Sequence, residues 1–304
     1  TLQISKMESD DVAALTTAAV QGLTSDQIVA LGTDQIQALK TAQVAALTTA
    51  QVAALQTIDL AAMTSNQVAA FSSKQIAALN TQQIRNMETE DVAALTTAAV
   101  QGLDTDQIRA MSTDQIVSLT TAQVAALKVA QIAAMTTLQI ANMETADLAA
   151  LTTAQVVGLT TDQIKVLTTD QIPALKSAQI AAIETADFTL MTTNELQALT
   201  STQAAALSSR QIAALNTLQI ARLETEDLAS LTTGALRGMS TDQIVALTTD
   251  QIPALKTAQI ASLTTAQVAA MQTVDVAQLT TTQIAALTTA QLAAMSDTQL
   301  AALG

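Results

Sequence analysis

Acidic side chains gather in short clusters along a chain that contains no histidine and no cysteine. Carboxylate oxygens are the ligands that Ca²⁺ prefers, and the ion takes roughly six to eight oxygens. Acidic clusters that recur along a repetitive chain could therefore collect calcium if folding stacked them. The clusters are Glu8, Asp10 and Asp11; Glu88, Glu90 and Asp91; Glu144 and Asp147; Glu184 and Asp187; and Glu224, Glu226 and Asp227.

Two triplets are the best-placed calcium candidates: Glu88, Glu90 and Asp91, and Glu224, Glu226 and Asp227. Neither has the glycine-punctuated Asp spacing of an EF-hand or of a calcium-binding nonapeptide repeat. We therefore predict no metal site. The favoured interpretation is that these acids lie in the first turns of helices, where the helix dipole favours a negative charge, and that they keep the protein soluble. Calcium binding is the weaker alternative.

The residue types needed for catalysis are missing or badly placed. A nucleophilic Ser or Thr needs a neighbouring base, and the chain has no His or Cys to activate one. No glycine-rich phosphate loop occurs. Four lysines recur at one place in a repeat and are interpreted as solvated charges rather than bases: Lys40, Lys128, Lys176 and Lys256. We predict that the protein is not an enzyme and binds no cofactor.

The charge of the chain excludes several partners. A net charge of −14 opposes binding to nucleic acid, which needs Lys and Arg to neutralise phosphates, and to anionic membrane surfaces. Thr and Gln interrupt every apolar run well before the ~18 residues that a membrane-spanning helix needs. No signal peptide is visible, and the chain opens inside a repeat without a start Met. We expect a segment of a longer protein.

An eight-residue repeat, L-T-T-A-Q-V-A-A with positions a to h, runs through all 304 residues as 38 octads. Position a falls on every eighth residue from Met7 to Leu303, position f on every eighth residue from Ile4 to Leu300, and both are apolar. Position c is almost always Ser or Thr, and position e is mostly Gln. No residue is inserted or deleted, so the repetition itself determines the fold.

The spacing of the apolar positions favours helix over strand. Positions f and a are three residues apart, which puts them on one face of a helix, whereas a strand would alternate a and f of one octad between its faces. Ala, Gln and Leu are also good helix formers. We predict a short helix of roughly one and a half turns from position d to the next position a.

The octads cannot join into one long helix. Eight residues at about 100° each rotate the apolar stripe by roughly 80° per octad, so no single partner could cover it. Pro173 and Pro253 at position g would also break such a helix. The Thr pair at b and c suits a helix cap, where its hydroxyls are used by the backbone rather than offered as an ordered surface array. The prediction is an all-α solenoid: one short helix per octad, Thr–Thr corners, and positions a and f facing a narrow interior.

A longer period of five octads divides this single solenoid into larger units. Units that open with acidic residues close their second octad with Gly22, Gly102, Gly158 or Gly238. One unit has lost three whole octads, which supports the octad as the basic structural repeat. The sequence does not decide whether 40 residues make one turn of five octads or two tighter turns. In either case we expect the acidic openings to recur on one side of the solenoid at every fifth octad. The units are about 7–46, 47–86, 87–126, 127–142 (shortened), 143–182, 183–222, 223–262 and 263–302.

The repeated stretch "LTTAQVAA" resembles the octapeptide-rich regions of very large, uncharacterised bacterial surface or secreted proteins. This resemblance implies a stalk, filament or adhesin spacer, and it brings no functional residues with it. We expect a structural protein that forms a rigid rod, stalk or filament, lies outside the cell or on a bacterial cell surface, and assembles with itself end to end or laterally. The alternative is a solenoid that presents one face to a protein or other ligand as a binding or adhesion module.

Overall fold

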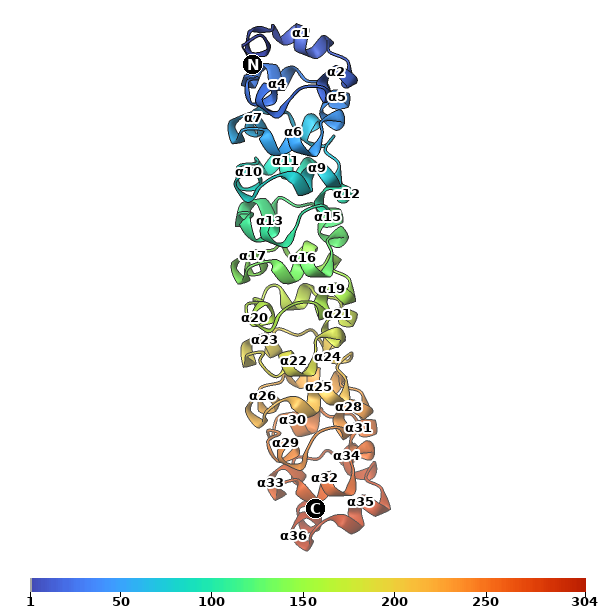
Figure 1. Cartoon of the computed structure of the whole chain (residues 1–304). Helices are drawn as coiled ribbons and strands as arrows, with labels where there is room; N and C mark the ends of the chain where they lie inside the picture. The colour runs from blue at the N-terminus through green and yellow to red at the C-terminus, as the bar shows by residue number, and fades with distance from the viewer. Residues whose placement is uncertain (1) are drawn as a thin grey trace. The chain divides into compact units, whose positions relative to one another are not determined.

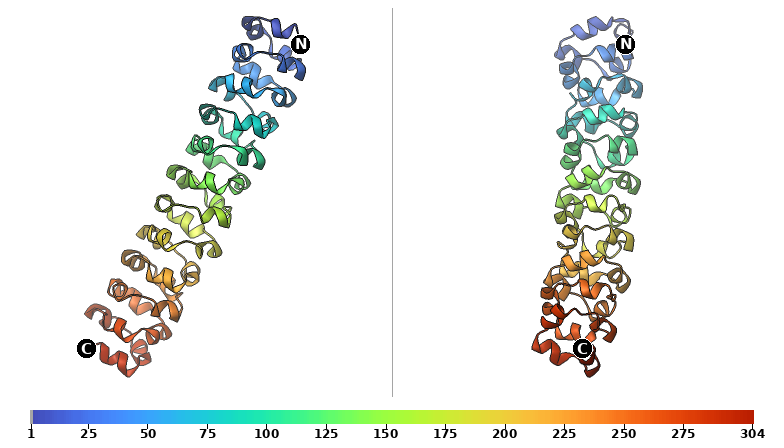
Figure 2. Two further views of the ribbon diagram at one scale, coloured as in Figure 1. Left: turned by 90° about the vertical axis from the view of Figure 1, so that its left-hand side faces the viewer. Right: turned by 180° about the vertical axis from the view of Figure 1, so that it is seen from behind.

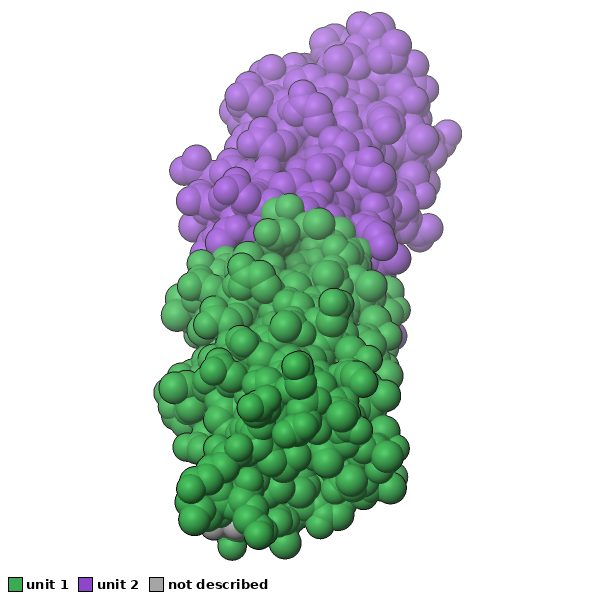
Figure 3. Space-filling view, turned by 90° about the horizontal axis from the view of Figure 1, so that it is seen from above, with its two compact units in different colours: residues 1–160 green, residues 161–304 purple. Residues whose placement is uncertain are grey.

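The computed structural model describes residues 2–304, and regular structure in this range is entirely helical (Figure 1). It comprises 36 α-helices and two 3-10 helices, and residues 2–304 form no strand. The predicted all-α repeat solenoid is confirmed. Contacts divide the chain into two compact units, residues 1–160 and 161–304 (Figure 3).

The helices are short and evenly spaced in both units. The first unit contains η1 (Ile4–Lys6), α1 (Ser9–Ala14), α2 (Thr17–Gln21), α3 (Ser25–Val29), α4 (Thr33–Ala38), α5 (Thr41–Ala46), α6 (Thr49–Ala54), α7 (Thr57–Ala62), α8 (Ser65–Val68), α9 (Ser73–Ala78), α10 (Thr81–Arg85), α11 (Thr89–Ala94), α12 (Thr97–Val100), α13 (Thr105–Ala110), α14 (Thr113–Val117), α15 (Thr121–Ala126), α16 (Val129–Ala134), α17 (Thr137–Ala141), α18 (Thr145–Ala150) and α19 (Thr153–Val157). The second unit contains α20 (Thr161–Ile164), η2 (Ile172–Ala174), α21 (Ser177–Ala182), α22 (Thr185–Phe188), α23 (Thr193–Gln197), α24 (Ser201–Ala204), α25 (Ser209–Ala214), α26 (Thr217–Ala221), α27 (Thr225–Ser230), α28 (Thr233–Arg237), α29 (Thr241–Val245), α30 (Gln251–Ala254), α31 (Thr257–Ser262), α32 (Thr265–Ala270), α33 (Thr273–Val276), α34 (Thr281–Ala285), α35 (Thr289–Ala294) and α36 (Asp297–Ala302).

Most octads fold in a similar way, as helix α6 illustrates. Thr48 at position b is the extended N-cap, the helix runs from position c to position h, and Leu55 at the next position a is extended again with ψ 135°. The N–H of Leu55 still closes the last turn on the carbonyl of Val52, at 3.2 Å. The predicted helix from d to a is therefore shifted: it begins one residue earlier and ends one residue earlier, because the residue at a turns the chain toward the next corner.

The corner is stabilised by a reciprocal pair of hydrogen bonds. The Thr48 hydroxyl accepts from the N–H of Gln51, at 3.2 Å, and the Gln51 side-chain oxygen accepts from the N–H of Thr48, at 2.8 Å. This capping box satisfies two of the N–H groups that a helix start leaves without partners. The predicted capping role of the first Thr is confirmed. The two prolines lie in short elements, Pro173 in the three-residue η2 and Pro253 in the four-residue α30.

Within each unit the helices stack as successive coils (Figure 2). A helix packs on the one three positions further along the chain, as α1 does on α4 and α24 does on α27. Hydrogen bonds between coils join residues 25 to 31 positions apart. One coil therefore takes between three and four octads rather than five. The expectation that acidic openings align at every fifth octad is wrong, because five octads are not a whole number of coils.

The interior of each coil is built from positions a and f, as predicted. Val52 and Leu55 are 0% and 3% exposed, and the same two positions are buried along nearly the whole chain. The side chains at g point outward, while those at h are mostly half-buried. Position e is also buried, and this was not foreseen.

Candidate functional site

A row of buried glutamines at position e connects each coil to the one before it. The side-chain amide nitrogen of Gln51 donates to the carbonyls of Val20 and Leu23, at 2.7 Å each. Gln211 donates in the same way to Ile180 and Ile183, at 3.0 and 3.1 Å. Such bonds recur within both units. We call this row the glutamine ladder; its members with bonds to an earlier coil are Gln35, Gln43, Gln51, Gln67, Gln75, Gln83, Gln107, Gln115, Gln123, Gln131, Gln139 and Gln155 in the first unit, and Gln203, Gln211, Gln219, Gln243, Gln251, Gln259, Gln267, Gln283, Gln291 and Gln299 in the second.

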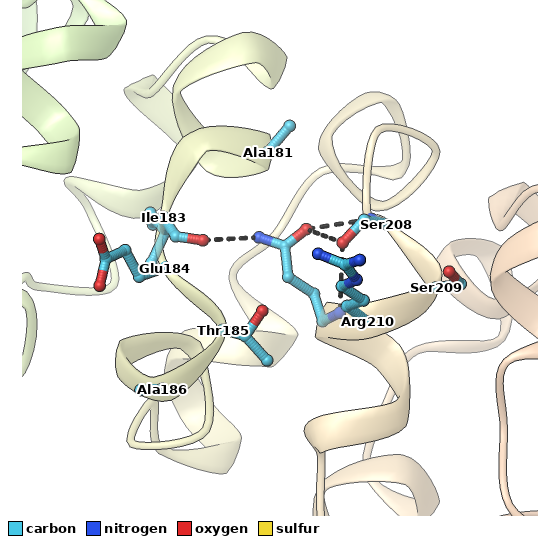
Figure 4. A pocket seen from close by; sticks show the side chains of 9 residues that line it. Ala181, Ile183, Glu184, Thr185, Ala186, Ser208, Ser209 and Arg210 are labelled. Carbon is cyan, nitrogen blue, oxygen red and sulfur yellow. Dashed lines mark hydrogen bonds between the residues drawn. The ribbon is translucent and has the colours of Figure 1, made fainter.

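Each ladder amide performs two tasks at once. Figure 4 shows one of them: the oxygen of Gln211 accepts from the N–H and the hydroxyl of Ser208, while its nitrogen donates to Ile183 of the preceding coil. The oxygen caps the start of its own helix, and the nitrogen donates to two carbonyls at the end of an earlier helix. The carbonyl of Ile180 already accepts from the N–H of Ile183, whereas the carbonyl of Ile183 depends on the glutamine. Only a carboxamide combines an acceptor and two donors in one plane. Gln at position e is therefore chemically specific and is not a generic helix former.

Aspartate replaces Gln at several ladder positions and reverses the direction of the bond. Asp91 cannot donate, and its Oδ1 instead accepts from the hydroxyl of Ser65 in the preceding coil, at 3.0 Å. Asp227 accepts from Ser201 at 3.0 Å in the same manner. Asp187 follows the same pattern, since it accepts from the Thr161 hydroxyl at 2.7 Å. In all three pairs the hydroxyl comes from a position c that lies 26 positions earlier in the chain.

Several aspartates at position e are almost completely shielded from solvent. Asp59, Asp227 and Asp275 are each 2–3% exposed, and one carboxylate oxygen of each has no hydrogen-bond partner. Burial raises the pKa of Asp59 and of Asp275, and a backbone N–H bond lowers the pKa of each in partial compensation. Burial also raises the pKa of Asp91, with Glu88 and Glu90 adding to the increase while the Ser65 bond opposes it. Burial of an ionised group without full pairing is unfavourable, so these positions are weak points in the ladder.

The six calcium candidates do not converge. Asp91 is buried between coils, whereas Glu88 and Glu90 are exposed; Asp227 is buried, while Glu224 and Glu226 are exposed in the same arrangement. Among residues 2–304, no three acidic side chains come together in a way that could hold a metal ion.

The acids lie where helix starts were predicted. Glu90 and Asp91 are in the first turn of α11, and Glu226 and Asp227 are in the first turn of α27. Hydrogen bonds from its own backbone N–H and from the Thr89 hydroxyl lower the pKa of Glu90. The first-turn interpretation of these residues is confirmed.

The surface between corners of successive coils is hollowed into open grooves. One groove has a volume of about 720 Å³ and is lined by Glu184, Arg210 and other polar and apolar residues (Figure 4). A second groove, of about 540 Å³, lies at the equivalent corners around Glu8 and Asp34. Ser208 in the larger groove donates its hydroxyl to Gln211, at 2.9 Å, so the helix cap already uses it.

The structural role of position e is the main feature that sequence reasoning missed. Two signals were available: Gln recurs there with few exceptions, and T-x-x-Q before an apolar residue is the signature of a capping box. That signature explains the amide oxygen. The bonds from the nitrogen could not be inferred, because they depend on the number of octads in one coil.

Short helices, a continuous apolar interior and a ladder that repeats with the octad define this chain as a helical repeat protein of the solenoid class. The chain belongs to the ALTTAQ repeat family, whose profile matches residues 4–41, 52–87, 84–121, 108–137, 140–177, 180–217, 220–257 and 268–304. No curated protein matches the chain. In the described part of the chain, no helix is both long and apolar enough to cross a membrane.

Proposed function

We propose that the chain is a structural element that forms a rigid rod, stalk or filament and has no catalytic role. The glutamine ladder carries this proposal. Each ladder step contributes a cap bond and bonds to the preceding coil, and a net contribution of about 1 kcal/mol per buried hydrogen bond would make adjacent coils hard to separate. Stability of this kind is distributed between nearest neighbours, which suits an extended element under load.

The proposed setting is extracellular or on a bacterial cell surface, with the chain assembling with copies of itself. The resemblance to octapeptide-rich surface proteins supports the setting, and labelling of intact cells with an antibody against residues 2–304 would test it. Exposed apolar side chains at position d support lateral assembly: Ile58, Leu138 and Leu218 are 60–63% exposed and recur at every tenth octad. The same side chains also support the second candidate, a module that presents them to another protein.

Small-angle scattering and negative-stain imaging test the rod. A compact globule of this length would have a radius of gyration of about 19 Å, and we expect a clearly larger value. Filaments whose number grows with protein concentration would support self-assembly, and their loss in an Ile58→Ser, Leu138→Ser, Leu218→Ser variant would identify the lateral contact. A radius near that of a globule would contradict the rod, and a monomer at all concentrations would favour the binding module.

A further inference from the structure

Three glycines mark places where successive coils approach most closely. Gly102, Gly158 and Gly238 each face a position-c residue of the preceding coil. A Cβ on Gly102 would overlap the backbone of Ser73, and a Cβ on Gly238 would lie 2.8 Å from the carbonyl oxygen of Ser209. A Cβ on Gly158 would overlap the side chain of Val129. The coils therefore meet with almost no space between them at these crossings.

The crossing at Gly102 borders a groove of about 380 Å³ on the surface of the first unit. Two lysines, Lys74 and Lys128, line this groove together with Ser73 and Gln101. The other lining residues are Ala77, Ala98 and Gly102. The Gln101 amide nitrogen donates to the Ala126 carbonyl at 2.8 Å, which fixes one wall to the next coil. No carboxylate lines the groove.

An all-cationic groove is unexpected in this protein, because acidic residues outnumber basic ones by 26 to 12. Within residues 2–304, the ion pairs are Arg109–Asp106 and Lys165–Asp162, so neither groove lysine is paired. Asp104, on the neighbouring helix α13, is used as a cap and accepts from the N–H of Gln107, at 2.7 Å. The two ammonium groups therefore lack an internal counter-charge.

The other two crossings provide internal comparisons. Around Gly158, the positions of Lys74 and Gln101 are taken by Ala130 and Val157, so the same backbone approach occurs without these polar groups. Around Gly238, Arg210 and Arg237 take those positions. Arg210 also lines the groove that contains Glu184, which does not include Gly238. The close approach thus does not require cations, and the groove at Gly102 combines two lysines with a lining free of acids.

We propose that the groove at Gly102 binds a single tetrahedral oxyanion, a phosphate or sulfate group, and this site is independent of the proposed structural role. Lys74 and Lys128, which both line the groove, supply the charge as point-charge donors, a known mode of phosphate binding by lysine. The hydroxyl of Ser73, which also lines the groove, supplies a neutral donor. A nucleic acid is disfavoured, because the net charge of −14 repels a polyanion over a longer range than two lysines attract it.

Calorimetric titration of the full chain with inorganic phosphate, at constant ionic strength maintained with chloride, tests the site. We expect saturable binding with a stoichiometry near one. The variant Lys74→Gln, Lys128→Gln should bind at least tenfold more weakly, and Lys74→Arg, Lys128→Arg should retain binding within about threefold. The matched control is Lys40→Gln, Lys176→Gln, which changes the net charge equally at two other exposed lysines and should bind as the native chain does.

Two results would overturn the proposal: heat that chloride alone reproduces, and an equal loss of binding in both double Gln variants, since either would reduce the effect to general charge screening. Phenyl phosphate identifies the source of the anion. Tighter binding of phenyl phosphate than of inorganic phosphate assigns the site to a phosphate ester on a larger molecule, whereas the opposite order assigns it to the free ion. Either order of affinity requires that the groove binds an oxyanion, so either result supports the proposal.

Discussion

Ladder steps with Gln and ladder steps with Asp or Ala solve the same stacking problem with different chemistry. At Gln83 one side chain caps its own helix through the N–H of Asn80, at 2.7 Å, and donates to Leu55 of the coil before, at 2.7 Å. At Asp91 the neighbouring coil must supply the donor, and at Ala99 the side chain offers no polar group at all. Ala99 is followed by Gly102, where the coils come into backbone contact. The comparison indicates that a Gln step stabilises the contact between coils through its own side chain. An Asp step depends on a hydroxyl from the neighbouring coil, and the Ala step at Ala99 depends on the close approach of the coils.

Removal of one glutamine from the ladder should have the largest effect on the free energy of unfolding. Gln83→Ala removes the cap bond to the N–H of Asn80 and leaves the carbonyl of the buried Leu55 without its donor, and we expect a loss of about 3 kcal/mol in the free energy of unfolding. Gln82→Ala is the matched control, since Gln82 is adjacent but exposed, and it should change stability little. Urea denaturation, together with amide exchange in α8 to α11, measures both. Equal effects of the two substitutions would deny the ladder its role.

A methyl group added at the close crossing that follows an Ala step should have the second-largest effect on stability. Gly102→Ala puts a methyl group into the backbone of Ser73, and we expect a loss of about 2 kcal/mol because the coils must separate. Gly234→Ala supplies the contrast: its Cβ would lie 3.8 Å from the nearest atom, and replacing a helical Gly should stabilise α28 by about 0.5–1 kcal/mol. Opposite signs in thermal denaturation would verify the crossing; a gain at both sites would contradict it.

Converting an Asp step into a Gln step should stabilise the chain by a smaller amount. Asp59→Gln removes a carboxylate with a buried, partnerless oxygen and places an amide within reach of the carbonyls of Ile28 and Leu31, the positions that ladder bonds reach elsewhere. We expect a gain of about 1 kcal/mol in the free energy of unfolding. Asp34→Asn, at an exposed first-turn position of α4, serves as the control and should be neutral or slightly destabilising. Destabilisation by Asp59→Gln would show that the shorter side chain is required there.

The pH dependence of stability should show the smallest effect. Asp59 and Asp275 have a raised pKa in the folded state, so the native state binds their protons more tightly than the unfolded chain does. Their stabilising contribution is complete below the ordinary Asp pKa and is lost as pH rises through the raised value. Glu90 opposes this trend, because its lowered pKa contributes stability that is lost on acidification. Asp59→Gln with Asp275→Gln should therefore reduce the gain in stability between neutral pH and about pH 4, measured by urea midpoints. An unchanged pH profile would exclude these two groups as its source.

Much of the fold follows from the octad alone. The strict spacing of positions a and f predicts helices with a shared interior, and Thr at b predicts the N-cap; Val52, Leu55 and Thr48 occupy these places as expected. The helix limits were displaced by one residue, because an apolar residue at a can serve the core while its backbone is extended. The number of octads in a coil could not be predicted, because side-chain volume and cap geometry together determine it.

The site was less predictable than the fold. We predicted no metal site and interpreted Glu88, Glu90 and Asp91 together as first-turn acids, with calcium binding as the weaker alternative. Asp91 instead turns inward as a substitute for Gln, while the two glutamates stay in solvent. Exposure follows position in the octad rather than chemical type. The lysine groove was also missed, because Lys74 and Lys128 are far apart in sequence and face one groove only when the coils are stacked.

The residues at position c allow the solenoid to gain or lose whole octads. The buried Asp91 and Asp227 each accept from a hydroxyl at the position c that lies 26 positions earlier, and nearly every residue at position c is Ser or Thr. Val129 is an exception without consequence, since the residue at the matching position e of the following coil is Gln155, which bonds to other groups. A gene that gains or loses whole octads by recombination would thus place an equivalent Ser or Thr 26 positions before either of these two aspartates. The protein can change its length over evolutionary time without redesigning its interior.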